Sequence, residues 1–265
     1  KQGLTFIHPF DDPTVIAGQG TIGKELIDQM SDDVAAVFVP IGGGGLMAGI
    51  ATYIKAKRPD VKIIGVEPRD SAAMSESIAA GKPITLDHVG IFADGVAVKR
   101  VGDETFRLCS RFVDEIVTVD TDQICAGIKD IFEDTRSIVE PAGALAVAGV
   151  KKYIAEHEEK GNAFVVINCG ANVNFDRLRH IAERAAVGEQ QEMLLAVEIP
   201  EEPGSFRRFC QALGRRGITE FNYRYNDAKH AHIFVGVQLR RGAEEHAELL
   251  DHLSALGYLV ADLSD

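Results

Sequence analysis

Four consecutive glycines, Gly42, Gly43, Gly44 and Gly45, are the strongest chemical signal in the sequence. They lie between an apolar run at residues 34–39 and an apolar helical pattern. Without side chains, consecutive backbone N–H groups can converge on one point, and the helix that follows adds the partial positive charge of its N-terminus. Because four glycines in a row cost backbone entropy on folding, a plain turn would not require them. We expect the loop to bind an anion, most naturally a phosphate.

The glycines alone leave the kind of phosphate open. No Gly-Lys-Ser/Thr sequence follows them, which excludes a Walker A loop. The spacing of Gly43, Gly45 and Ala48 does fit the fingerprint of a dinucleotide-binding fold, and Glu67 stands about 20 residues later at the end of an expected strand. On spacing alone, a nicotinamide dinucleotide is therefore an alternative ligand.

Two more segments could line the same site. Residues 168–175 follow an apolar run, and in open α/β sheets ligands bind at the carboxyl ends of the strands. The thiol of Cys169 could face a heteroatom of the ligand there, although a glycine turn around a small buried cysteine explains the segment equally well. In residues 139–144, Glu140 precedes a proline at the start of a helical pattern, which helix initiation explains without any function.

The elements that must position these residues alternate β-branched runs with helical patterns through about residue 185, which is typical of an α/β fold with a parallel sheet flanked by helices. The expected strands are residues 34–39, 62–67, 115–119 and 163–167, and the expected helices are residues 46–57, 121–132, 142–156 and 174–186. Asp120 or Thr121 would cap the second of these helices. On one face of that helix we expect Ile124, Ile128, Ile131 and Phe132.

The pattern changes after a polar break at residues 188–191. We therefore expect the first domain to occupy residues 1–188 and a second domain to occupy residues 192–265. The expected strands of the second domain are residues 194–199, 218–225, 231–239 and 258–263, with helices at residues 205–213 and 243–256. This β-α-β-β-α-β order in about 70 residues is that of a ferredoxin-like domain. In its second helix we expect Ala247, Leu250 and Leu253 to face the core.

Net charge and composition restrict the classes of partner and the cellular compartment that we expect for this chain. The net charge of −12 repels nucleic acid and anionic membranes, so we expect neither as a partner. The four cysteines are far apart in the sequence, which indicates reduced thiols in the cytoplasm rather than a disulfide framework. Residues 34–54 carry no charge, but Pro40 and the glycines interrupt them, so a buried strand and helix explain this run better than a membrane span. No signal peptide opens the chain, and the absence of an initiator Met indicates a missing N-terminal portion.

Taken together, seven short motifs resemble the biosynthetic threonine deaminases (threonine ammonia-lyases), which are fold-type II pyridoxal-phosphate enzymes. The motifs lie at residues 10–13, 18–21, 42–46, 65–68, 93–97, 140–144 and 170–175. The resemblance covers the whole chain, and the tail looks like the first of the family's ACT-like regulatory subdomains. It implies an incomplete fold of the tryptophan synthase β type and takes precedence over the dinucleotide interpretation.

The resemblance also assigns roles to individual residues. The backbone N–H groups of Gly42, Gly43, Gly44, Gly45 and Leu46 would hold the phosphate of pyridoxal 5'-phosphate. Cys169 matches the position where the family usually has a serine against the pyridine nitrogen, and a neutral group there suits β-elimination. Glu67, Glu140 and Asn172 are expected in a second layer around the site.

The reaction that the resemblance implies converts L-threonine to 2-oxobutanoate and ammonia, the first step of isoleucine biosynthesis. A cytoplasmic homo-oligomer, a tetramer in the family, would carry it out. Residues 201–206 resemble the loop where ACT-like domains bind an amino acid, so isoleucine would inhibit and valine would relieve that inhibition. A plain packing or dimerisation module explains the second domain as an alternative.

Two departures from the family pattern bear on activity. Cys169 in place of serine keeps a polar contact but weakens its hydrogen bond. The Ser-x-Lys-x-Arg-Gly segment that carries the family's Schiff-base lysine does not occur between residues 1 and 265. We expect that segment before Lys1 and a second regulatory subdomain after Asp265, so this chain alone is predicted to be inactive. A non-catalytic amino-acid-sensing remnant is the main alternative, and an NAD-dependent dehydrogenase is a weaker one.

We expect no metal site. Related serine racemases use the glutamate of a Glu-Pro motif with a carboxylate six residues further on, whereas this chain has Glu67 and then Ala73. His230 and His232 alternate along an expected strand and face the same side, but they provide at most two of the four ligands that a zinc site needs.

Overall fold

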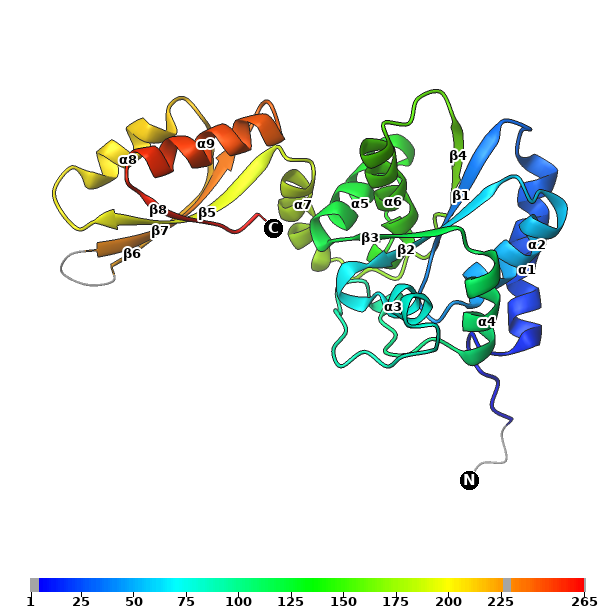
Figure 1. Cartoon of the computed structure of the whole chain (residues 1–265). Helices are drawn as coiled ribbons and strands as arrows, with labels where there is room; N and C mark the ends of the chain where they lie inside the picture. Colours follow the sequence, from blue (N-terminus) through cyan, green and yellow to red (C-terminus); the bar gives the residue numbers. More distant parts are fainter. Residues whose placement is uncertain (1–4, 226–229, 265) are drawn as a thin grey trace. The chain divides into compact units, whose positions relative to one another are not determined.

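The computed structural model describes residues 5–225 and 230–264 and divides into two compact units (Figure 1). The first unit is Lys1–Ile181 and the second is Ala182–Asp265. The division falls within helix α7 (Arg177–Gly188), whereas the sequence places a domain boundary at residues 188–192. As a functional boundary, that position stays a prediction. Within the described residues, every helix is too short or too polar to cross a membrane.

A four-stranded parallel sheet forms the centre of the first unit. Its strands are β1 (Val34–Pro40), β2 (Lys62–Pro68), β3 (Glu115–Val119) and β4 (Ala163–Val166), in the order β3-β2-β1-β4. The chain runs from β1 outward to β3 and then returns to β4 on the other side of β1. The strand order therefore reverses between β1 and β4, and the crevice at the carboxyl ends of these two strands is where such sheets bind ligands.

Helices cover both faces of this sheet (Figure 1). On one face lie α1 (Pro13–Gln29), α2 (Gly45–Lys57) and α4 (Asp103–Phe112), and on the other lie α5 (Thr121–Thr135) and α6 (Pro141–His157). Right-handed crossovers account for this arrangement, because the β1-to-β2 and β3-to-β4 connections run in opposite directions across the sheet. The short helix α3 (Ala73–Ala80) follows β2. β1 is buried on both faces, as its continuous apolar run predicts.

The second unit is an antiparallel sheet with two helices. Its elements are β5 (Glu192–Pro200), α8 (Ser205–Leu213), β6 (Ile218–Tyr225), β7 (His230–Gln238), α9 (Ala243–Ala255) and β8 (Leu259–Asp262). The strand order β6-β7-β5-β8 is the ferredoxin-like order, which confirms the predicted fold class. Alternate residues of β5 and β7 pack with Phe209, Leu249 and Leu253 into one core.

Two predicted core positions are wrong. Phe132 in α5 is 41% exposed, although Ile124, Ile128 and Ile131 on the same helix are buried. Ala247 in α9 is exposed, and Leu249 is buried in its place. The prediction for Leu253 is confirmed, and Leu250 packs partly buried against the same core.

Candidate functional site

The glycine turn leaves the sheet directly after β1. The N–H of Ile41 still donates to the carbonyl of Val66 at 2.9 Å, and α2 then begins at Gly45. Gly44 is the N-cap of α2 and has φ 94° and ψ −1°, a left-handed conformation that favours glycine. Its carbonyl accepts the first helical hydrogen bond, from the N–H of Ala48 at 2.8 Å. The tight turn aims the N-terminus of α2 at the carboxyl edge of the sheet.

The N–H groups of this turn have no partner. Gly42, Gly43, Gly44, Gly45 and Leu46 donate no backbone hydrogen bond to any residue that the structure describes. Gly43, Gly44 and Gly45 are nevertheless buried. Buried N–H groups without an acceptor cost free energy, and the first N–H groups of a helix are a common binding site for anions. The turn therefore fits a phosphate group, with the amides as its donors.

The other side of the turn is packed against the protein, which explains why each position is glycine. A Cβ atom on any of the four would approach a neighbouring atom to 3.0 Å or less. These neighbours are Val96 for Gly42, the Phe10 ring for Gly43, Met74 and Thr105 for Gly44, and the backbone or Cβ of Phe10 for Gly45. A side chain at any of these positions would have to displace the turn or its support.

Helix α4 holds the carbonyl groups of the turn. The hydroxyl of Thr105, which is fully buried, donates to the carbonyl of Gly43 at 2.7 Å. The Sγ of Cys109 lies 4.0 Å from the carbonyl oxygen of Gly44. Because the C=O and N–H of one peptide point in opposite directions, these contacts direct the N–H groups of Gly44 and Gly45 away from α4. The turn is thus oriented with its carbonyl groups toward α4 and these N–H groups away from it.

Glu67 supports the turn from beneath. It is fully buried at the end of β2, and its two carboxylate oxygens accept from the N–H groups of Met74 and Ser75, each at 2.8 Å. These bonds cap α3, and Met74 of α3 lies against Gly44. Burial raises the pKa of Glu67 to about 7, although the two N–H groups act in the opposite direction. Since both oxygens are engaged in the interior, Glu67 cannot contact a ribose as the dinucleotide alternative requires.

Cys169 and Glu140 form a second group at the carboxyl end of β4. The N–H of Glu140 donates to the carbonyl of Gly170 at 3.2 Å, and the Glu140 carboxylate occupies the space beside Gly170 where a Cβ would lie. Gly143 of α6 packs equally closely against the carbonyl of Cys169. Burial raises the pKa of the Cys169 thiol, and the charge of Glu140 raises it further. The thiol is therefore neutral at physiological pH.

A short 3₁₀ turn, Asp94–Val96, joins these two groups. Val96 lies against Gly42, whereas Gly95 lies against Ala142 and within about 3.5 Å of the Glu140 carboxylate, measured from an ideal Cβ. The glycine turn, the 3₁₀ turn and Glu140 therefore border one region, at the carboxyl ends of β1 and β4.

Not every predicted site residue joins this region. Asn172 is exposed, and within the described residues no hydrogen bond links its side chain to Glu140 or to the glycine turn. The roles assigned to the turn, Cys169, Glu67, Glu140 and Asn172 stay predictions.

The sequence did not indicate Phe10, Met74 or Thr105 as neighbours of the turn. Their contacts span thirty or more residues of chain, and no local pattern marks such a contact. The signal that could have found Thr105 is the acidic first turn of α4, Asp103 and Glu104, which indicates a helix N-terminus.

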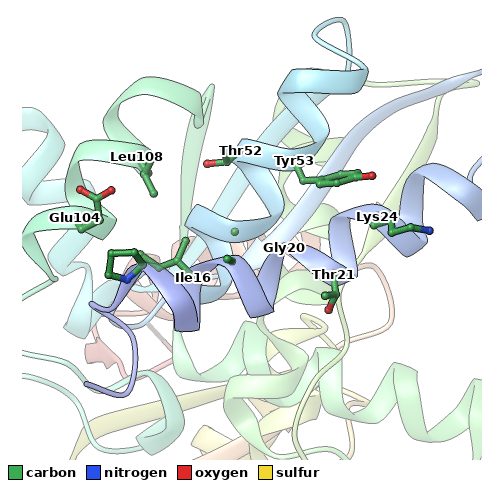
Figure 2. Close-up of a pocket in the computed structure, with 11 residues that line it drawn as sticks. Ile16, Gly20, Thr21, Lys24, Thr52, Tyr53, Glu104 and Leu108 are labelled. Atoms are coloured by element: carbon green, nitrogen blue, oxygen red, sulfur yellow. The ribbon is translucent and has the colours of Figure 1, made fainter. Parts of the chain in front are cut away.

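A separate cavity of about 390 Å³ lies between α1, α2 and α4 (Figure 2). Ile16, Tyr53 and Leu108 contribute apolar walls, with Lys24 and Glu104 among the few charged groups. None of the glycine-turn residues lines it. Among the described residues, no group of three or more His, Cys, Asp or Glu side chains is placed to hold a metal ion. His230 and His232 are exposed on β7, and His230 lies 3.7 Å from Glu198.

The chain matches two family models. Residues 1–170 match the model described as pyridoxal-phosphate dependent enzyme. Residues 183–265 match the model described as the C-terminal regulatory domain of threonine dehydratase. The two matched ranges correspond to the two compact units of the structure.

Relatives over the whole chain include two bacterial proteins named biosynthetic L-threonine dehydratase. The protein of Escherichia coli (strain K12) is 58% identical over 265 residues, which are 100% of this chain and 51% of that protein. The protein of Burkholderia multivorans is 57% identical over 264 residues, which are 100% of this chain and 52% of that protein. The chain spans about half the length of the curated relatives it matches.

A solved structure shows the same fold over about two thirds of the chain. The processed form of threonine deaminase isoform 2 from Solanum lycopersicum is 48% identical in sequence and superposes with a TM-score of 0.68. The superposition covers 69% of this chain and 53% of that one. Family models, relatives and fold all agree with the family that the motifs of the sequence resemble.

Proposed function

Because this chain belongs to the family of pyridoxal-phosphate-dependent enzymes, we propose that it provides the cofactor-phosphate site and the regulatory unit of a threonine ammonia-lyase. Such an enzyme converts L-threonine to 2-oxobutanoate and ammonia, the first step of isoleucine biosynthesis. Two relatives named biosynthetic L-threonine dehydratase, each at least 57% identical over the chain, support this reaction.

One observation supports the cofactor site most strongly. Five consecutive N–H groups, from Gly42 to Leu46, lack an acceptor among the described residues at the N-terminus of α2. A phosphate ester has several acceptor oxygens and a negative charge, so it would satisfy these donors and interact favourably with the helix dipole. The carbonyl groups of Gly43 and Gly44 would not repel the phosphate, because they point away from it. The Gly43 carbonyl accepts from the Thr105 hydroxyl of α4, and the Gly44 carbonyl accepts from the N–H of Ala48 in α2 and lies near Cys109 of α4.

Cys169 is the residue that we assign to the pyridine nitrogen of the cofactor. When bound, pyridoxal phosphate withdraws electrons from the α-carbon of the amino acid. The raised pKa of Cys169 keeps its thiol protonated, so the thiol can donate a weak hydrogen bond and does not carry a charge. A neutral donor leaves the ring nitrogen unprotonated, which moderates that withdrawal and suits elimination of the β-hydroxyl. Glu140 would lie beside this contact, and Asn172, which is exposed, would stand further from it.

The second unit is proposed to bind an amino acid effector, isoleucine or valine, in the loop between β5 and α8. A pocket of about 310 Å³ lies there, and its walls include Phe206, Phe221 and Tyr223. Glu201 and Glu202 could attract the ammonium group of the effector, while the N-terminus of α8 faces its carboxylate. The match to a regulatory domain supports this role. We further propose a functional boundary at residues 188–192, a homo-oligomer, a tetramer by resemblance, and a cytoplasmic location.

The cofactor site can be tested with two ligands that lack the reactive aldehyde. Pyridoxamine 5'-phosphate and pyridoxamine differ by the phosphate alone, and neither forms a Schiff base with a lysine. We expect calorimetry on the chain to show that the phosphate ester binds at least about tenfold more tightly. Gly44→Ala should remove this preference, and Gly18→Ala should keep it, because a Cβ at Gly18 meets no atom within 4 Å. Equal affinity for the two ligands in the wild-type chain would contradict the proposal.

A further inference from the structure

A carboxylate far from the glycine turn in sequence caps the helix that holds the turn. Asp11 Oδ1 accepts from the N–H groups of Glu104 and Thr105, at 2.9 and 3.1 Å, and its Oδ2 accepts from that of Asp103 at 3.0 Å. These are first-turn N–H groups of α4, which its own N-cap, Gly102, cannot satisfy with a side chain. An ideal Cβ on Gly102 would lie only 2.1 Å from Asp11 Oδ1. Asp11 therefore replaces the local cap that α4 lacks.

The capped turn of α4 is the part of that helix that touches the glycine turn. Thr105 donates its N–H to Asp11 and its hydroxyl to the carbonyl of Gly43. The same residue thus links the carboxylate to the turn through two hydrogen bonds. Any rotation or fraying of the first turn of α4 would move the Thr105 hydroxyl, and with it the peptide that carries the N–H of Gly44.

The residues beside Asp11 reach the turn from another direction. The ring of Phe10 fills the space where a Cβ of Gly43 would lie, and the Phe10 backbone lies against Gly45. His8 holds this segment, because its Nδ1 accepts from the N–H groups of Asp11, at 2.9 Å, and of Phe10, at 3.4 Å. The segment 8–11 therefore contacts the turn directly through Phe10 and indirectly through Asp11 and α4.

We propose that Asp11 is a positioning residue for the glycine turn, and that it sets the affinity of the turn for a phosphate ester by fixing the first turn of α4. This inference rests on the proposed function of the turn. Asp11 itself does not touch the ligand in this account. Its contribution reaches the phosphate through Thr105 and the orientation of the Gly43–Gly44 peptide.

The neighbouring residue offers a matched control. Asp12 also caps a helix with its carboxylate, since its Oδ1 accepts from the N–H groups of Thr14 and Val15 at 2.8 and 3.2 Å in the first turn of α1. No hydrogen bond connects either of those two residues to the glycine turn within the described part of the chain. Loss of either carboxylate removes a cap of the same kind, but loss of Asp11 alone should reach the phosphate site.

The test compares the affinities of Asp11→Ala and Asp12→Ala for pyridoxamine 5'-phosphate and for pyridoxamine by calorimetry. Asp11→Ala is expected to weaken binding of the phosphate ester about tenfold and to change that of pyridoxamine less than about twofold. Asp12→Ala should change neither affinity by more than about twofold. Circular dichroism and thermal unfolding of each variant report whether both caps contribute similarly to stability.

Variants of Thr105 keep the test decisive if Asp11→Ala does not fold. Thr105→Val removes the hydroxyl and should reproduce the selective loss of the phosphate ester, whereas Thr105→Ser should restore it. The inference is overturned if Asp11→Ala and Thr105→Val each weaken the binding of both ligands equally, or if Asp12→Ala changes the two affinities as Asp11→Ala does. It is also overturned if Asp11→Asn binds the phosphate ester more tightly, because the charge of Asp11 would then only repel the phosphate. If the wild-type chain itself does not prefer the phosphate ester, the proposed function fails instead.

Discussion

Two turns of this molecule have almost the same backbone and opposite surroundings. Gly44 precedes α2 with φ 94° and ψ −1°, and Gly204 precedes α8 with φ 90° and ψ −6°. Both are left-handed N-caps that connect a strand to a helix. Around Gly44, Met74 and Thr105 leave no room for a Cβ, whereas around Gly204 the nearest atom to a Cβ is the end of the Arg208 side chain at 3.5 Å.

The difference shows that local conformation does not make a binding site. The turn at Gly44 is buried, neutral and packed against four other segments of the chain, at Phe10, Met74, Val96 and Thr105. The turn at Gly204 is exposed and acidic, with Glu202 paired to Arg208 at 2.6 Å. We infer that long-range packing gives the first turn the fixed donors that a cofactor phosphate requires, while the second keeps the freedom that an effector loop can use.

Substitution of the two glycines should give the largest effect. Gly44→Ala combines left-handed strain with overpacking against Met74 and Thr105, so we expect the free energy of unfolding to fall by about 2–5 kcal/mol. Gly204→Ala carries the strain alone and should cost about 1–2 kcal/mol. Urea unfolding followed by circular dichroism measures both. Equal losses would show that the crowding around Gly44 relaxes without cost.

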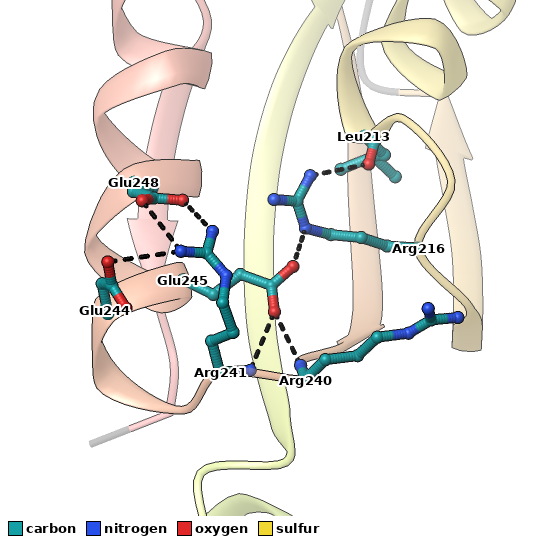
Figure 3. Close-up of polar contacts among 7 residues, drawn as sticks. All are labelled: Leu213, Arg216, Arg240, Arg241, Glu244, Glu245 and Glu248. Carbon is teal, nitrogen blue, oxygen red and sulfur yellow. Dashed lines mark hydrogen bonds and ion pairs between the residues drawn. The ribbon is translucent and has the colours of Figure 1, made fainter.

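Glu67 in the first unit and Glu245 in the second are both buried, but they have different hydrogen-bond partners. Glu67 accepts two N–H groups at the start of α3 and has no cation beside it among its hydrogen-bond partners. Glu245 accepts the N–H groups of Arg240 and Arg241, at 2.6 and 3.1 Å, and also the Nε of Arg216 at 2.8 Å (Figure 3). The N–H of Arg240 is the main cause that lowers the pKa of Glu245, against the effect of burial.

For Glu67, the pH dependence follows from its raised pKa. Between pH 4.5 and about 7, the folded state holds a proton that the unfolded state has released. The contribution of Glu67 to stability is therefore greatest below pH 4.5 and is lost as the pH rises toward 7, by up to about 3 kcal/mol. The difference in unfolding free energy between the wild type and Glu67→Gln should follow this curve in urea titrations at several pH values. A difference that does not change with pH would contradict the account of Glu67.

For Glu245, the sign is the opposite. Its pKa is lowered in the folded state, so its contribution to stability is complete above the unfolded pKa, near 4.5, and is lost as the pH falls through the folded value. Glu245→Gln should therefore destabilise the second unit most at neutral pH and least in acid. The same urea titrations measure this. If both variants changed with pH in the same direction, the hydrogen bonds that Glu245 accepts, that from Arg240 first, would not outweigh its burial.

The smallest expected effect concerns Cys169. A serine hydroxyl is a stronger hydrogen-bond donor than a thiol. Cys169→Ser should therefore raise the affinities for pyridoxamine and for its phosphate ester by a similar factor, about two- to threefold. Cys210→Ser in the second unit is the matched control and should change neither affinity. A higher affinity for the phosphate ester alone would indicate that Cys169 lies near the phosphate of the cofactor and not near its pyridine nitrogen.

Elements with local signals were predictable, and those with remote partners were not. The start of α5 was expected from Asp120 or Thr121 as its cap, and the structure shows Asp120 in this role, in a capping box with Gln123. The starts of α3 and α4 are capped instead by Glu67 and Asp11, which lie outside those helices, so no local capping residue marks them. In α9, the hydrophobic pattern failed because a charged residue, Glu245, occupies an inward position through its hydrogen bonds.

The same limit applies to the site. Glycine spacing alone predicted the turn, its position between β1 and α2, and its affinity for an anion as a hypothesis. The orientation of its N–H groups depends on Thr105, Met74 and Phe10, whose contacts only the tertiary structure brings together. Features set by neighbouring residues could therefore be predicted from the sequence, whereas contacts between distant residues required the structure.

The most direct measurement is the backbone amide spectrum of the ¹⁵N-labelled chain with and without pyridoxamine 5'-phosphate. The account predicts that the N–H resonances of Gly43, Gly44 and Gly45 shift on addition of the phosphate ester, while those of Gly18 and Gly204 do not. A spectrum in which the three turn amides stay in place while the ligand binds elsewhere would contradict the central claim, that this turn holds the phosphate of the cofactor.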